Sequence, residues 1–164
     1  FLVPPGKPLI WRGPMLHSAI RQFLSDVAWG ELDYLIIDLP PGTGDVPLTV
    51  FQSIPVDGII IVTSPQEMVS MIVGKAVNMA EKMNIPIVGL IENMAFFECP
   101  KCHERLKIFG ESHIDQIAER HNMKILGYIP IRPELSKLCD EGRIEAFEGD
   151  WIDETVKVLV KSAF

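Results

Sequence analysis

The sequence predicts an α/β fold, built as a layered, mostly parallel sheet flanked by helices. Apolar runs rich in β-branched residues and lacking polar alternation are typical of strands buried on both faces of a parallel sheet. Helical patterns separate these runs, and a strand–helix–strand order implies right-handed crossovers. The runs expected to form strands are Leu9 to Trp11, Tyr34 to Ile37, Gly58 to Val62, Ile85 to Ile91 and Ile125 to Ile129.

Helices are expected between the strands. Residues 15–29 form the first candidate. Ser64 to Glu67 has the form of a capping box with proline at the first helical position. The apolar stripe behind it predicts packing of that helix against the sheet, and its members are Met68, Ile72, Ala76, Met79 and Met83. Two later helices are expected to begin at caps, one at Ser112 with Ile114, Ile117 and Ala118 inward, and one at Asp150 with Ile152, Val156, Leu159 and Val160 inward.

The composition is that of a globular domain. Hydrophobic residues make up 48% of the 164 residues, and the formal net charge is −7. Lysine and arginine are scattered rather than clustered, so we expect no nucleic-acid partner. No apolar run reaches the length of a membrane helix and the start lacks the pattern of a signal peptide, so we expect a cytoplasmic protein with no membrane partner. The chain does not begin with Met, and we interpret it as part of a longer protein.

An acidic residue directly follows the second apolar run. Asp38 opens the string Asp-Leu-Pro-Pro-Gly-Thr-Gly-Asp, which ends at Asp45. A carboxylate at the carboxyl end of a buried strand faces the crevice where α/β sheets bind ligands, and it can hold the magnesium of a nucleotide through a water. Gly42 and Gly44 would let the loop approach a phosphate closely. The same residue types also suit a simple turn capped by Asp38.

The three cysteines predict a reduced protein with one candidate metal site. Cys99 and Cys102 form a C-x-x-C pair inside residues 94–110, an insertion that interrupts the alternating pattern. Thiolates suit zinc or iron–sulfur clusters, which usually need four protein ligands, so a symmetric dimer would complete the set. A redox dithiol and, through His103, a c-type haem attachment site are further interpretations. No function is assigned to Cys139, His17, His113 or His121.

Several short strings, in their order and spacing, resemble the Mrp/Nbp-type family of MinD/ParA-like P-loop ATPases. They are Trp11 to Met15, Trp29 to Asp45, Val62 to Gln66, Val88 to Met94 and Cys99 to Cys102. The resemblance implies a P-loop NTPase fold that lacks its N-terminal part, because no Walker A sequence G-x-x-x-x-G-K-S/T is present. The whole chain, residues 1–164, would then be the C-terminal portion of a single P-loop domain.

The resemblance also implies roles for single residues. Asp38 would be the Walker B carboxylate that holds magnesium through a water. The switch II loop would consist of Gly42, Thr43, Gly44 and Asp45. Asn93 would bond the adenine base, and the segment after Pro130 would lie beside it. Arg132 departs from the aspartate that relatives often have, which leaves the contacts on this side of the base open.

The function implied by the resemblance is that of an iron–sulfur cluster carrier. A homodimer would hold one 4Fe–4S cluster between the Cys99 and Cys102 pairs of two chains and pass it to apoproteins, coupled to ATP and magnesium in the complete protein. A MinD/ParA-like regulatory ATPase with structural zinc at the same cysteines is the alternative, and a fragment that only dimerises is a third. Without the phosphate-cradling loop, we expect the chain alone to lack ATPase activity.

Overall fold

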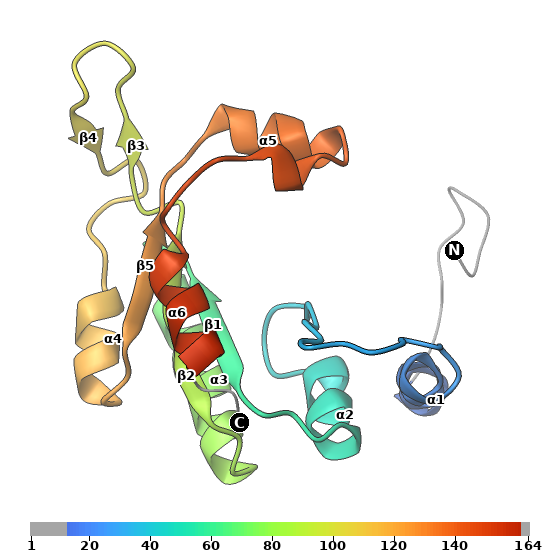
Figure 1. Ribbon diagram of the computed structural model, residues 1–164. Coiled ribbons are helices and arrows are strands. Elements are labelled where there is room, and N and C mark those ends of the chain that lie inside the picture. The colour runs from blue at the N-terminus through green and yellow to red at the C-terminus, as the bar shows by residue number, and fades with distance from the viewer. Residues whose placement is uncertain (1–12, 162–164) are drawn as a thin grey trace. The chain divides into compact units, whose positions relative to one another are not determined.

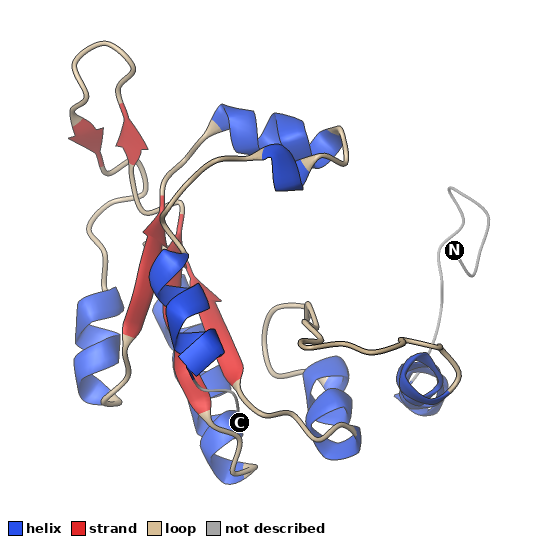
Figure 2. Ribbon diagram, viewed as in Figure 1, coloured by secondary structure: helices blue, strands red, loops and turns tan. Residues whose placement is uncertain are grey.

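A computed structural model describes residues 13–161 of the chain. The chain divides into two compact units, Phe1–Val56 and Asp57–Phe164, and each is described by itself. Figures 1 and 2 show the helices and strands of both units. The expected strand from Leu9 to Trp11 lies outside the described residues.

The first unit contains two helices that contact each other, α1 (Gly13–Ser25) and α2 (Asp45–Ser53). Helix α1 confirms the expected helix, although it begins earlier and ends before Trp29. The indole N–H of Trp29 donates to the Phe23 carbonyl at 3.0 Å, which folds the chain back over the end of α1. Helix α2 begins with Asp45, whose negative charge suits the positive end of the helix dipole.

The strand expected from Tyr34 to Ile37 is not formed. These residues are irregular in the structure, and the Ile36 side chain is 86% exposed. A strand buried on both faces requires hydrogen-bonded neighbours at its edges. The described part of the first unit contains no strand that could serve as one. The prediction of a strand directly before Asp38 is therefore wrong for this structure.

The second unit is built on a parallel sheet of three strands in the order β1-β2-β5. These strands, β1 (Ile59–Thr63), β2 (Ile87–Asn93) and β5 (Ile125–Ile129), confirm three of the expected apolar runs. At the carboxyl edge of the sheet, Glu92 pairs with both Thr63 and Tyr128, and Asn93 pairs with Ile129. The α/β class predicted from the sequence is confirmed.

Helices cover the sheet of the second unit. Those that contact it are α3 (Glu67–Lys82), α4 (Ile114–Arg120) and α6 (Asp153–Lys161). Helix α5 (Pro133–Asp140) packs mainly with a short 3-10 turn (Ile144–Ala146). In the view of Figure 1, α6 lies in front of the sheet and α3 behind it. The main core joins α3 and α4 to the sheet through Ile61, Val73, Val77, Leu90, Ile114 and Ala118.

The predicted packing of α3 against the sheet is confirmed, and Ala76 of the expected stripe packs against the core. The most buried positions of α3 and α6 nevertheless differ from the predicted ones. In α3 the side chains of Val73, Val77 and Ala80 are buried, whereas Ile72 is 42% exposed. Apolar residues at helical spacing show that a helix has a buried face, but they do not show which of two neighbouring apolar stripes is the buried one. The stripe of Val73, Val77 and Ala80 has the smaller side chains, which lets the helix approach the sheet closely. In α6 the buried side chain is that of Thr155, and the expected inward residues Ile152, Val156 and Val160 are exposed.

The three expected helix caps, at Ser64, Ser112 and Asp150, differ from their predictions to different degrees. Helix α3 begins at Glu67 rather than Pro65, because Gln66 is extended and the Ser64 hydroxyl bonds to the Gln66 side chain, so no capping box forms. Helix α6 begins at Asp153, and Asp150 contributes its backbone carbonyl, which accepts from the Asp153 N–H at 3.1 Å. Before α4 the N-cap position is taken by His113, and Ser112 lies one residue earlier. The Ser112 hydroxyl still accepts from the Ile114 N–H, the first of the helix, at 3.1 Å.

The insertion at residues 94–110 forms a small hairpin. Two short antiparallel strands, β3 (Phe97–Glu98) and β4 (Arg105–Leu106), make its stem. The Arg105 guanidinium lies 4.5 Å from the centre of the Phe96 ring, a cation–π contact across the stem. Among the described residues, no helix is both long and apolar enough to cross a membrane.

Candidate functional site

The cysteine pair occupies the turn of the hairpin. The Cys99 N–H donates to the Glu104 carbonyl at 2.9 Å, and the His103 N–H donates back to the Cys99 carbonyl at 2.9 Å. The turn between them is tight, and His103 has a left-handed φ of 57°. Cys99 is half-buried and Cys102 is exposed, and both are free thiols. The hairpin therefore presents two sulfurs on one exposed turn.

Hydrogen bonds within the turn favour the thiolate of Cys99. Its sulfur accepts from the backbone N–H of Cys102 and from that of Lys101, and these bonds lower the pKa of the Cys99 thiol below its usual value. Thiolates, not thiols, bind metals and clusters, so this arrangement suits a soft metal or an iron–sulfur cluster.

His103, the residue after Cys102, bonds through one ring nitrogen to Glu98. Its Nδ1 lies 3.0 Å from Glu98 Oε1, and this hydrogen bond lowers the pKa of the Glu98 carboxyl. Over the described part of the chain, no group of three His, Cys, Asp or Glu side chains is arranged to hold a metal ion. One chain thus offers two cysteine ligands and not a complete set.

Asn93 and Pro130 lie together at the carboxyl edge of the sheet. Asn93 ends β2 and pairs with Ile129, the residue before Pro130. The Asn93 Oδ1 accepts from the Met94 N–H at 2.9 Å, and no hydrogen bond involves its Nδ2 among the described residues. The structure therefore brings these two predicted base-side residues together, with one amide donor available to a ligand.

Arg132 lies two residues after Pro130 and carries a buried donor. Its guanidinium lies 5.5 Å from the Trp151 ring centre, and its Nε is buried without a hydrogen-bond partner among the described residues. A buried donor without an acceptor carries a free-energy cost of about 1–3 kcal/mol.

Glu92 is a buried carboxyl that the sequence analysis did not single out. It is 2% exposed, and it accepts a hydrogen bond of 2.5 Å from the Ser112 hydroxyl. Burial raises the pKa of the Glu92 carboxyl, partly opposed by the bond from Ser112. The sequence signal that could have revealed it is a charged residue, Glu92, at the end of an apolar run expected to form a buried strand.

A second carboxyl group lies at the start of α4. Asp115 Oδ1 accepts from the Tyr128 hydroxyl at 3.2 Å. Burial first, and Asp115 second, raise the pKa of Tyr128 to about 12. Tyr128 is therefore a neutral hydrogen-bond donor at any physiological pH.

The loop from Asp38 to Asp45 belongs to the first unit. Asp38 is exposed and follows an irregular segment, whereas Gly42 has a φ of 90°, a conformation that favours glycine. Gly44 precedes α2 as its N-terminal cap, and Asp45 is the first residue of the helix. The loop thus leads directly into a helix N-terminus, as expected for a segment that approaches phosphate.

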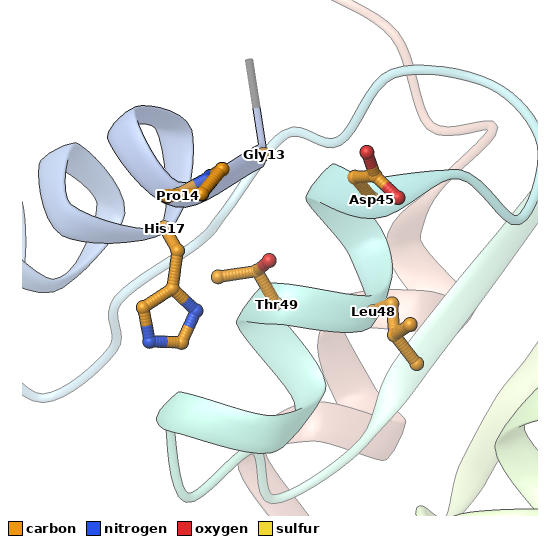
Figure 3. A pocket seen from close by; sticks show the side chains of 6 residues that line it. All are labelled: Gly13, Pro14, His17, Asp45, Leu48 and Thr49. Atoms are coloured by element: carbon orange, nitrogen blue, oxygen red, sulfur yellow. The ribbon is translucent and has the colours of Figure 1, made fainter.

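A small hollow lies between the starts of α1 and α2 (Figure 3). It measures about 300 Å³ and is lined by Gly13, Pro14, His17, Asp45, Leu48 and Thr49. A Cβ atom on Gly13 would lie 3.9 Å from Asp45 Oδ2. The string that begins at Trp11 and the loop that ends at Asp45 therefore meet here, through Gly13 and Pro14.

Residues 1–162 match the family described as "ParA: NUBPL iron-transfer P-loop NTPase". The chain belongs to this family. The "Iron-sulfur cluster carrier protein" of Methanocaldococcus jannaschii is 51% identical over 144 residues, covering 87% of this chain and 50% of the relative. The "Iron-sulfur cluster transfer protein NUBPL" of Mus musculus is 42% identical over 159 residues, covering 97% of this chain and 50% of the relative. The chain spans about half the length of the curated relatives it matches.

Solved structures of this NTPase class support the same assignment. A nucleotide-binding protein from Archaeoglobus fulgidus, in complex with ADP and with cobalt found in it, is 50% identical with a TM-score of 0.77, covering 84% of this chain and 56% of that one. The MinD cell division protein of Aquifex aeolicus has a TM-score of 0.61 at 20% identity, covering 96% of this chain and 64% of that one. This likeness establishes a shared fold and nothing further. The resemblance to Mrp/Nbp-type ATPases is confirmed, as is a fold that covers part of a P-loop NTPase.

Proposed function

We propose that this chain is the cluster-holding part of an iron–sulfur cluster carrier, with Cys99 and Cys102 as the ligands of a 4Fe–4S cargo. The observation that supports this most directly is the exposed hairpin turn, where the Cys99 sulfur accepts two backbone N–H groups. Such bonds stabilise thiolate sulfur, and exposure allows a cargo to be received and released. A reducing compartment, the cytoplasm, suits two free thiols, one half-buried and one exposed.

The cargo site is completed by a second copy of the chain. Four thiolates usually hold a 4Fe–4S cluster. One hairpin supplies two such sulfurs, those of Cys99 and Cys102. Two hairpins related by a twofold axis would supply four equivalent sulfurs. The resulting site is shared between chains, so separation of the chains would release the cluster to an apoprotein.

ATP and magnesium act in the complete protein. We assign the base contact to Asn93, whose Nδ2 makes no hydrogen bond among the described residues, and to the segment at Pro130 beside it. Asp38 is assigned to magnesium through a water, and Gly42, Thr43, Gly44 and Asp45 to the loop that senses the terminal phosphate. The glycine conformation and the following helix N-terminus support that assignment.

Anaerobic reconstitution with iron and sulfide tests the proposal. The parent protein should take up about four irons per dimer, as one cluster requires. Cys99→Ala and Cys102→Ala should each remove the cluster, whereas Cys139→Ala, the matched control at an exposed cysteine outside the hairpin, should bind iron like the parent. Full iron binding by the two hairpin variants would refute the assignment. Four-sulfur binding of zinc with no iron uptake would instead favour a regulatory ATPase with structural zinc.

A further inference from the structure

The cysteine hairpin leaves the sheet through a conformation that needs support. Met94, the first residue after β2, has a left-handed φ of 56°. Such a backbone is unfavourable for a residue with a side chain. The Met94 side chain is 43% exposed, so its burial does little to hold this turn. The Asn93 Oδ1 holds it instead, by accepting from the Met94 N–H at 2.9 Å.

The hairpin stem is also tied to the end of β5. The Ala95 N–H donates to the Ile129 carbonyl at 3.0 Å, and the Ile131 N–H donates to the Phe96 carbonyl at 2.7 Å. These two bonds flank Pro130, which has no N–H of its own to donate. They form only if the chain turns at Met94 in the observed direction. The turn that Asn93 holds is therefore the condition for the stem to remain attached.

We propose that Asn93 is a positioning residue for the cysteine hairpin, and that it sets the place of Cys99 and Cys102 through the Met94 turn and the two bonds beside Pro130. The inference rests on the proposed function, because it concerns the hairpin assigned to the cargo and the residue assigned to the base. The two tasks use opposite ends of one amide. Its Oδ1 holds the turn, and its Nδ2 stays available to a base, so a bound base fixes the orientation that the hairpin requires.

Amide hydrogen exchange on the iron-free chain tests this role. Asn93→Ala should speed exchange at Ala95 and Ile131 by about two- to tenfold, the factor expected for the loss of one ordinary hydrogen bond. Asn93→Asp keeps the side-chain acceptor and should leave exchange close to that of the parent. Amides inside α3 should not change in any variant, which shows that the fold is intact. Asn84→Ala is the matched control, since Asn84 has a similar φ of 54° but lies before β2.

A rescue variant separates positioning from general stability. Glycine adopts left-handed φ readily, so Asn93→Ala combined with Met94→Gly should return the exchange of Ala95 and Ile131 toward the parent rate. Unchanged exchange in Asn93→Ala, or no recovery in the double variant, would overturn the inference. Neither result depends on iron, so the proposed function is judged separately by the iron content of the Cys99→Ala and Cys102→Ala proteins.

Discussion

Replacing Ser112 with alanine should destabilise the second unit, and by more at neutral than at acidic pH. The hydroxyl has two partners, accepting from the Ile114 N–H at 3.1 Å and donating to the buried Glu92 carboxylate at 2.5 Å. Loss of a helix cap costs about 1 kcal/mol. An ionised buried carboxylate deprived of its donor adds about 1–3 kcal/mol. We therefore expect a decrease of about 2–4 kcal/mol in the unfolding free energy near neutral pH.

The pH dependence follows from the raised pKa of Glu92. Its folded pKa lies above the ordinary value of 4.5, so the folded state binds more protons than the unfolded state above that pH. Unfolding free energy then falls as pH rises through this window. Ser112→Ala removes the hydrogen bond that lowers this pKa, so it deepens the fall. At about pH 4, where the carboxyl is mostly protonated in both states, mainly the cap term of about 1 kcal/mol should remain.

Urea unfolding at the two pH values measures this difference. Far-ultraviolet circular dichroism reports the transition, and Glu92→Gln is the companion variant because its side chain keeps the shape and an acceptor oxygen but cannot ionise. In the Glu92→Gln background the cost of Ser112→Ala should be independent of pH and close to the cost of about 1 kcal/mol for losing the bond to the Ile114 N–H. An equal cost at both pH values in the parent background would refute the role given to the Glu92 charge. So would a neutral-pH cost below about 0.5 kcal/mol, the ordinary range for a surface substitution.

Three further outcomes are expected. The 164-residue chain should bind MgATP much more weakly than a complete family protein; calorimetry that gave a micromolar affinity, about −8 kcal/mol, would show that the phosphate site is misplaced. In a complete protein, Asp38→Ala should abolish magnesium-dependent hydrolysis and preserve the circular dichroism spectrum, and hydrolysis near the parent rate would make Asp38 a turn residue. Gly127→Ala should lower the unfolding free energy by about 1–3 kcal/mol, because its Cβ would lie 2.2 Å from the Trp151 carbonyl oxygen; an unchanged urea midpoint would contradict this packing.

The strands of the second unit were predictable because local pattern and tertiary setting agree there. The runs ending at Val62, Ile91 and Ile129 lie in a sheet whose strands pair with one another. The run from Tyr34 to Ile37 has the same apolar pattern but no strand partner in the described part of its unit. A strand depends on its neighbours, and the pattern of one run cannot reveal whether they are present. For α3, helical spacing gave the period of the buried stripe but not its phase.

The candidate site was predictable to the extent that it is local. The C-x-x-C pair and its place in an insertion are visible in consecutive letters, as is Asn93 at a strand end. The contact between Glu92 and Ser112 joins residues 20 positions apart and follows only from the fold. The bonds of Ala95 with Ile129 and of Phe96 with Ile131 likewise depend on how β2 and β5 pair. No spacing rule in the sequence points to these long-range contacts.

Native mass spectrometry of the anaerobically reconstituted protein tests the central claim most directly. If two hairpins share one cluster, the cluster mass should appear on a dimer, at one 4Fe–4S per two chains. Gentle chelation of the iron should then convert that dimer to monomer, since the shared ligands hold the chains together. A cluster bound to an intact monomer would contradict the shared four-cysteine site. So would an iron-free protein, with Cys99 and Cys102 changed to alanine, that remains a dimer.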